Sequence, residues 1–195
     1  MELQELLSYL NALSENNNKQ WFADNKSRYE DAKSSFLLFT ELLINKIKEF
    51  DSRVDGVEAK NCMFRIYRDV RFSKNKKPYK TNFASFISQG GRKSNFAGYY
   101  IHMEAGKSFV GGGIYMPPSD SLKKIRKRIY ENPKQLIEIL NEKEFKKYFD
   151  GIYGEKLKTA PRGYPKDCEH IDLINHKHYA LAFPLQDDFW GQNDL

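Results

Sequence analysis

Seven cationic side chains lie within sixteen residues of the chain, around a single carboxylate. The segment from Cys62 to Lys80 reads CMFRIYRDVRFSKNKKPYK, and its one acidic residue is Asp69. The cations are Arg65, Arg68, Arg71, Lys74, Lys76, Lys77 and Lys80. Like charges packed this closely repel one another unless something negative offsets them. Arginine forks bind phosphate and carboxylate bidentately and lysines add positive field, so the segment predicts an anion-binding surface.

Apolar and polar residues alternate along this segment, which predicts a strand that sorts the side chains by face. One face would carry Arg65, Tyr67, Asp69 and Arg71. The same period places Arg68 on the apolar face, where a buried guanidinium needs an anion from another side chain or from a ligand. We therefore expect a small anionic ligand that bears phosphate or carboxylate. Its predicted binding residues are Arg65, Tyr67, Arg68, Asp69, Arg71, Lys74, Lys76, Tyr79, Lys80 and Arg162.

Three other interpretations of the segment stay open. Asp69 could pair with Arg65 or Arg71 while N-terminal glutamates and solvent take up the remaining charge, which would leave an ordinary surface. Asp69 could instead be the general acid or base of an enzyme, with the arginines stabilising developing charge. The interleaved aromatic side chains could stack nucleic-acid bases, although the chain has no RRM, KH or helix-turn-helix signature.

Three other motifs predict local features. Pro161–Pro165 is a rigid turn that displays Arg162, usable as a lid or as a surface brace. Gly111–Gly113 lies in an apolar strand pattern, where glycine indicates a bulge, a close backbone approach or an aromatic ring packed flat against it. Four polar residues near the C-terminus lack zinc-site spacing, so no metal is expected. They are Cys168, His170, His176 and His178. No nucleophile motif is recognisable, and no cofactor is expected.

The periodicity of the N-terminal third predicts helices. Leucines between Leu3 and Leu13 recur at helical spacing, and the run stops at the asparagine cluster Asn16–Asn18. A single apolar stripe then continues to Phe50, which predicts a long amphipathic helix with a break near Asn25.

Beyond this helix the apolar period becomes two residues, and short turns separate four predicted strands. The expected strands are 62–72, 79–87, 97–104 and 108–116. Helices are expected from Ser119, over 132–140, 142–149 and 171–174, with an edge strand at 179–183. The predicted fold is one α+β domain over 1–195. In it, an antiparallel meander of about four strands in residues 62–116 packs against N-terminal and C-terminal helices.

The chain resembles a known family through several local motifs. They are Asn16–Asn18, Trp21–Phe22, Asn25–Lys26, Tyr29, Phe64–Lys74, Lys76, Pro78–Lys80, Gly98–Tyr100, Gly111–Pro117, Pro161–Pro165 and His176–Lys177. On these residues, from the N-terminus to about Pro184, the chain resembles the largely bacterial family called domain of unknown function 2461. The resemblance implies no activity, so no catalytic residue follows from it. Lys77 stands where the family more often has Thr. Members usually continue with a further helix, so we expect a C-terminus at Leu195 that is short for the family.

The net charge of +6 is unevenly distributed. Residues 61–100 carry nine basic groups and one acidic group, and the rest of the chain is close to neutral. This concentration favours a specific anion site over a general affinity for polyanions.

Composition indicates a cytoplasmic protein. The two cysteines are too few for a disulfide framework, and the acidic N-terminus lacks the positive charge of a signal peptide. The longest apolar stretches are far short of the ~20 residues that a membrane span needs. The oligomeric state has no signature in the sequence.

Overall fold

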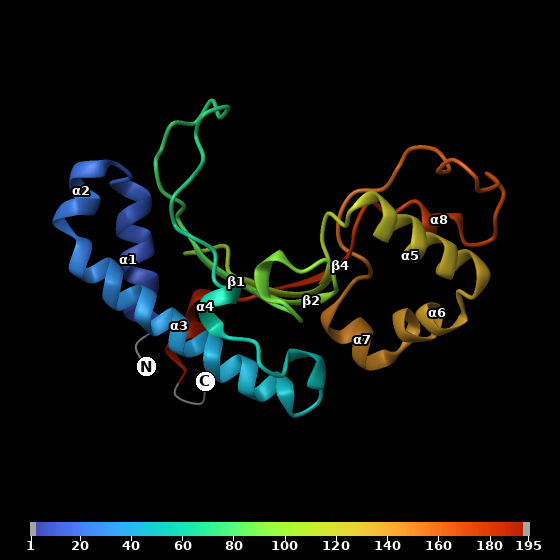
Figure 1. The fold of residues 1–195 in the computed structure, drawn as a ribbon, viewed down its shortest axis with the longest axis horizontal. Helices are drawn as coiled ribbons and strands as arrows, with labels where there is room; N and C mark the ends of the chain where they lie inside the picture. The colour runs from blue at the N-terminus through green and yellow to red at the C-terminus, as the bar shows by residue number, and fades with distance from the viewer. Residues whose placement is uncertain (1–2, 193–195) are drawn as a thin grey trace. The chain divides into compact units, whose positions relative to one another are not determined.

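A computed structural model describes residues 3–192 (Figure 1). Within this range the chain forms eight α-helices and a four-stranded antiparallel open sheet in the order β1-β2-β3-β4, which confirms the predicted α+β class. The helices are α1 (Leu3–Glu15), α2 (Lys19–Asp24), α3 (Lys26–Lys48), α4 (Ala59–Cys62), α5 (Ser119–Glu131), α6 (Lys134–Asn141), α7 (Lys143–Tyr148) and α8 (Ile171–Ile174). The strands are β1 (Phe83–Ile87), β2 (Gly98–Met103), β3 (Phe109–Ile114) and β4 (Tyr179–Pro184).

Contacts within the chain divide it into two compact units. The first comprises Met1–Ser94, Gly98–Val110 and Pro184–Leu195, and the second comprises Asn95–Ala97 and Gly111–Phe183. The single domain predicted over 1–195 stays a prediction. The expected shortness of the C-terminus concerns residues up to Leu195, and the last three of these lie outside the described range.

The N-terminal helices follow the predicted pattern. The leucine stripe of α1 is buried, and α2 begins where the Asn18 side chain accepts a hydrogen bond from the Trp21 backbone N–H at 3.0 Å. The apolar stripe then breaks at Asn25, which caps the end of α2 and precedes α3. The break near this residue is therefore confirmed.

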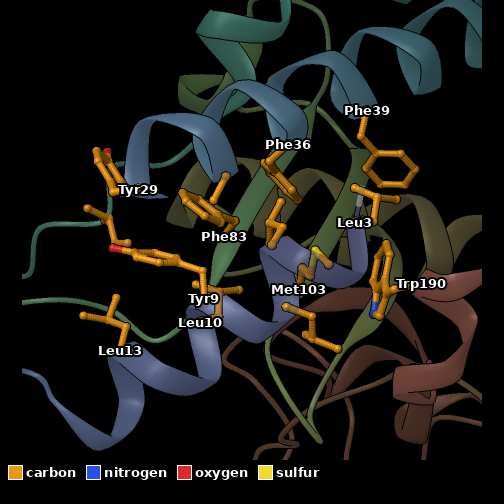
Figure 2. Packing of buried hydrophobic residues seen from close by; sticks show 14 of the residues in the cluster. Leu3, Tyr9, Leu10, Leu13, Tyr29, Phe36, Phe39, Phe83, Met103 and Trp190 are labelled. Atoms are coloured by element: carbon orange, nitrogen blue, oxygen red, sulfur yellow. The ribbon is translucent and has the colours of Figure 1, made fainter. Parts of the chain in front are cut away.

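The core of the first unit lies between α1, α3 and the inner face of β1 and β2 (Figure 2). Phe36 of α3 stacks on Phe83 of β1 with ring centroids 5.5 Å apart, and Phe39 meets Trp190 edge-on at 5.7 Å. Trp190 also donates its indole N–H to the Ser108 hydroxyl at 3.1 Å. The chain that follows β4 is thus fixed in the same core as the N-terminal helix.

Strand register divides the side chains of β1 and β2 between two faces. Phe83 pairs with Met103, and both belong to the core under α1 and α3. The next pair, Ala84 with His102, faces the other way because successive side chains alternate. Phe86 pairs with Tyr100 on that second face.

The expected strand at 62–72 is not a strand. Cys62 ends α4, and the chain from 63 to 80, which we call the basic loop, makes only isolated bridges, Met63 with Ser85 and Tyr67 with Tyr79. The alternation of the sequence is still visible, since Ile66 is 1% exposed and Tyr67 is 47% exposed. Extended backbone is enough to produce that alternation, and a paired ladder is not required. The remaining strand of the sheet is β4, which was expected as an edge strand at 179–183.

The second unit contains the predicted C-terminal helices α5 to α8. Arg126 of α5 donates to the carbonyl oxygens of Ile174 and His176, both at 2.9 Å, and so links α5 to the chain around α8.

The glycines of β3 are explained by a close backbone approach, one of the expected causes. A Cβ on Gly111 would lie 2.6 Å from the Leu181 carbonyl oxygen, and one on Gly113, whose φ is +104°, would collide with the Tyr179 carbonyl. The backbone of β4 therefore occupies the space that side chains would need, and no aromatic ring is involved in these approaches.

No helix between residues 3 and 192 has the length and apolar character needed to cross a membrane.

Candidate functional site

The basic loop is a two-armed excursion between α4 and β1 whose arms pair near their base (Figure 1). The Arg68 backbone N–H donates to Pro78 O at 2.9 Å, and Lys80 N–H donates to Ile66 O at 2.8 Å. Below these bonds, Phe64 N–H donates to Ala84 O at 2.9 Å. These backbone bonds hold the first residues of the basic loop beside its last residues, although the two are separated in the sequence.

The turn between α1 and α2 fixes the second arm of the loop. Asn17 accepts from the Tyr79 backbone N–H at 3.1 Å and donates to the Tyr79 carbonyl at 3.0 Å. The Tyr79 ring stacks on Phe22 of α2 with centroids 3.9 Å apart and planes 12° apart. Tyr79 is consequently buried and packs the loop against the core, and its predicted role as a ligand contact stays a prediction.

Arg68 does not point into the apolar core, contrary to the register expected for a strand. It is partly exposed, and its guanidinium donates to Lys77 O at 2.8 Å and to the Ser73 hydroxyl at 3.4 Å. No carboxylate pairs with it among residues 3–192. Arg68 braces the two arms of the loop and keeps its charge uncompensated.

Asp69 forms a bidentate pair with Arg71. Arg71 Nε lies 2.9 Å from Oδ1 and Nη2 lies 2.6 Å from Oδ2. Hydrogen bonds from the Arg71 side chain and backbone, followed by the charge of Arg65, hold the pKa of this carboxyl below its usual range. An ionised, paired carboxylate on an exposed arm has little capacity as a general acid, so the geometry does not favour Asp69 in that role.

The other cations of the basic loop have no carboxylate within 4.0 Å in the described part of the chain. Lys76 and Lys77 donate instead to backbone oxygens, Lys76 to Val70 O at 3.0 Å and Lys77 to Ser14 O at 3.4 Å. Those without a carboxylate partner are Arg65, Arg68, Lys74, Lys76, Lys77 and Lys80. The loop therefore keeps a strong positive potential at a defined place.

Lys80, like Arg68, is only partly exposed. Its ammonium lies 5.5 Å from the centroid of the Phe64 ring, and burial, followed by the charge of Arg65, lowers its pKa. Burial and the charge of Arg65 both disfavour the charged form of Lys80. An anion bound beside Lys80 would therefore offset an electrostatic cost already present in the fold.

A cavity of about 300 Å³ opens beside the second arm, and we call it the basic pocket. Its wall combines three cations with amide and hydroxyl groups. The lining residues are Asn17, Arg68, Asn75, Lys77, Tyr79, Lys80, Thr81 and Asn82. A small anion requires cations that neutralise its charge and neutral donors that orient it.

The pocket gathers only part of the predicted set. Arg68, Tyr79 and Lys80 line it, whereas six predicted residues of the unit do not. Those six are Arg65, Tyr67, Asp69, Arg71, Lys74 and Lys76. Arg162 is exposed in the second unit. The sequence-based prediction missed Asn17, Asn75, Lys77, Thr81 and Asn82 as pocket residues. The asparagine cluster among the family motifs was a signal for Asn17.

The histidines near the C-terminus have separate surroundings. His178 Nδ1 accepts the Met116 backbone N–H at 3.0 Å, and His176 is buried with its pKa lowered to about 4, mainly by burial. Within the described residues, no group of three or more histidine, cysteine, aspartate or glutamate side chains could hold a metal ion.

These features define an α+β protein in which helices and a sheet hold one cationic loop open around a small pocket. A family model described as "Conserved hypothetical protein (DUF2461)" matches residues 5–195. The chain therefore belongs to this family, and the resemblance stated from its motifs is confirmed. No curated protein and no solved structure matches the chain.

Proposed function

We propose that this protein binds a small anionic ligand, bearing phosphate or carboxylate, in the basic pocket. The observation that carries the proposal is that Arg68, Lys77 and Lys80 line one cavity while no carboxylate of the described chain neutralises them. Asn82 and Thr81 add neutral polar groups to the same wall. The pocket wall does not include Arg65, Lys74 and Lys76, but their charges add to the positive electrostatic potential in the pocket.

Isothermal titration calorimetry with inorganic phosphate and, separately, acetate tests this proposal and distinguishes the two ligand chemistries. The double variant Lys77→Gln/Lys80→Gln should weaken binding of the preferred anion at least about tenfold, because each charge-assisted hydrogen bond contributes about 1.5–3 kcal/mol. Lys93→Gln, which removes an exposed lysine outside the pocket, is the matched control. Equal affinities for the wild type and the double variant would refute the proposal.

One observation favours nucleic acid as a second candidate. Phe72, at the far end of the basic loop, is 97% exposed, and the Arg71 guanidinium lies 5.9 Å from its ring centroid. An exposed ring among cations can stack a base. Gel-shift binding of a single-stranded oligonucleotide that is lost in both Phe72→Ala and Lys76→Glu would support this candidate, and binding unaffected by either change would exclude the loop as the binding surface.

A further inference from the structure

A hydrogen-bonded chain of four polar side chains lies next to the basic pocket. Thr81 Oγ1 donates to Glu104 Oε1 at 2.5 Å, and Glu104 Oε2 lies 3.1 Å from His102 Nε2. On the other side of the imidazole, the Tyr100 hydroxyl lies 3.2 Å from Nδ1. We call Thr81, Tyr100, His102 and Glu104 the polar network.

Strand geometry holds the network in line. Tyr100, His102 and Glu104 are spaced two residues apart at β2 and its end, so all three face away from the core that Ile101 and Met103 enter. The Phe109 ring lies parallel to the His102 imidazole, 18° from it, with centroids 4.9 Å apart. The side chains of His102 and Glu104 are only 16% and 20% exposed, so packing fixes their orientation while a small part of each stays accessible.

The partners of His102 determine where its proton lies. A carboxylate can only accept, so Nε2 carries the proton donated to Glu104, and Nδ1 accepts from the Tyr100 hydroxyl. Burial, followed by the charge of Glu104, raises the pKa of Tyr100, so the phenol remains a donor. Two neutral groups also lie against the imidazole, the Asn82 amide from the β1 side at 3.5 Å and the Phe109 ring from β3.

Two cavities give a ligand access to the network. Thr81 and Lys77 line the basic pocket and also a second cavity of about 310 Å³, whose wall contains Glu104 and Lys107. A ligand whose anionic group contacts Lys77 could therefore place its next atoms beside Glu104. The basic pocket holds cations and the second cavity adds one partly enclosed carboxylate, which is the combination that proton transfer next to an anionic group requires.

We propose that the polar network is a proton-transfer site, with Glu104 as its acid–base group, serving a phosphate- or carboxylate-bearing ligand held in the basic pocket. The inference rests on the proposed function. The ligand class is an anion with an ionisable O–H, N–H or C–H near its charged group. His102 and Tyr100 are positioning residues, because they act on the ligand through Glu104.

The chemical step is a single proton transfer. The X–H bond of the ligand breaks, its electron pair stays on X, and the proton forms an O–H bond with the Glu104 carboxylate. Lys77, shared by both cavities, stabilises the negative charge left on the ligand. The reverse transfer returns Glu104 to its ionised state, so no oxidant, reductant or second reactant is needed.

The test follows the ¹⁵N chemical shifts of the His102 imidazole in the full chain by NMR at one fixed pH. The free protein should show the Nε2–H tautomer. Glu104→Gln should change the ¹⁵N shift of Nε2 because it removes the carboxylate that accepts from it, and Tyr100→Phe should change that of Nδ1 because it removes the hydroxyl that donates to it. These two changes test the hydrogen bonds of the network, and the response to an anion tests its link to the basic pocket. Glu144→Gln, on an exposed helix, is the control.

Inorganic phosphate is then added at a saturating concentration established by calorimetry. An anion held in the basic pocket beside Thr81 should change the His102 ¹⁵N shifts saturably, with the dissociation constant that calorimetry gives. Saturable phosphate binding with unchanged His102 ¹⁵N shifts would overturn this inference and leave the proposed function standing. Failure of phosphate and acetate to bind would overturn the proposed function, and this inference with it. The Nδ1–H tautomer in the free protein would overturn the inference alone.

Discussion

At the scale of single residues, Arg68 shows why a charge pattern alone does not identify a ligand. Its guanidinium donates to a backbone carbonyl and a hydroxyl, which orient it without neutralising it. Asp69 shows the opposite case, because Arg71 satisfies both carboxylate oxygens. Two neighbours in the sequence thus differ in their availability to a ligand, and the difference lies in their hydrogen-bond partners.

Tyr9 supplies a prediction about stability. It is 2% exposed, and its hydroxyl has no hydrogen-bond partner in the described structure (Figure 2). Tyr9→Phe keeps the ring and removes the unsatisfied group, so the free energy of unfolding should rise by about 1 kcal/mol. Urea unfolding monitored by circular dichroism measures the change.

Thr40 provides the comparison for Tyr9. This buried hydroxyl donates to Phe36 O and contacts the Ser85 hydroxyl at 3.0 Å, so its hydrogen bonds are made. Thr40→Val should lower the free energy of unfolding by about 1–2 kcal/mol. The account of Tyr9 would be contradicted if both variants changed stability in the same direction.

The buried side chain of His176 predicts that the free energy of unfolding depends on pH. Burial, then the charge of Lys156, lowers its pKa to about 4, below the ordinary value of 6.5, so the unfolded chain binds this proton more readily. The stability that depends on neutral His176 is therefore complete above pH 6.5 and is lost as the pH falls towards 4. Between pH 7 and pH 5 the loss should be about 2 kcal/mol.

Urea unfolding of wild type and His176→Gln at pH 7 and pH 5 checks this effect. The variant should lose less stability over that interval, whereas the control His170→Gln, at a partly exposed histidine, should behave as wild type. An identical pH dependence in wild type and His176→Gln would show that burial of this histidine is not the cause.

At the scale of elements, the turn between α1 and α2 positions the basic loop. Asn17→Ala removes both hydrogen bonds to the Tyr79 backbone, and neither backbone group has another partner assigned in the described chain. Stability should fall by about 1–2 kcal/mol, and phosphate should bind at least threefold more weakly because the loop must then be ordered on binding. Calorimetry measures the affinity. Asn16→Ala, at an exposed neighbour whose side chain bonds only to Ala12 O at the end of α1, should leave affinity unchanged.

The elements also show what sequence periodicity can and cannot predict. Helical spacing predicted α1, the break at Asn25 and the C-terminal helices, because burial of one helix face is a local signal. The two-residue period at 62–72 correctly indicated that Ile66 is buried and Tyr67 exposed, but no paired strand forms there. Pairing depends on which distant segment supplies the partner, and β4 joins the sheet from the far end of the chain.

The candidate site, like the fold, was predictable from the sequence only in part. The concentration of cations in 65–80 was predictable from the sequence, and the anion that we propose for them stays a prediction. The pocket wall was not, because Asn17 reaches Tyr79 across 62 positions of the chain and Thr81 reaches Glu104 across 23. His102 was overlooked because its importance comes from its alternation with Tyr100 and Glu104 on one strand face.

At the scale of the whole molecule, charge is localised: a net +8 lies in residues 61–100 of a chain whose total is +6. Nonspecific nucleic-acid affinity grows with the number of phosphates a surface neutralises. One short loop should therefore bind a single-stranded 20-mer at 0.15 M salt with a dissociation constant weaker than about 100 µM. Fluorescence anisotropy measures this constant, and submicromolar binding would support the nucleic-acid candidate instead.

The most direct test of the central claim is the position of an anion in a crystal of the full chain soaked with selenate, located by anomalous scattering. The account predicts an anomalous peak in the basic pocket, within hydrogen-bond reach of Arg68, Lys77 or Lys80, and no such peak in crystals of Lys77→Gln/Lys80→Gln. Selenate bound elsewhere, with the pocket filled by ordered water alone, would contradict the account.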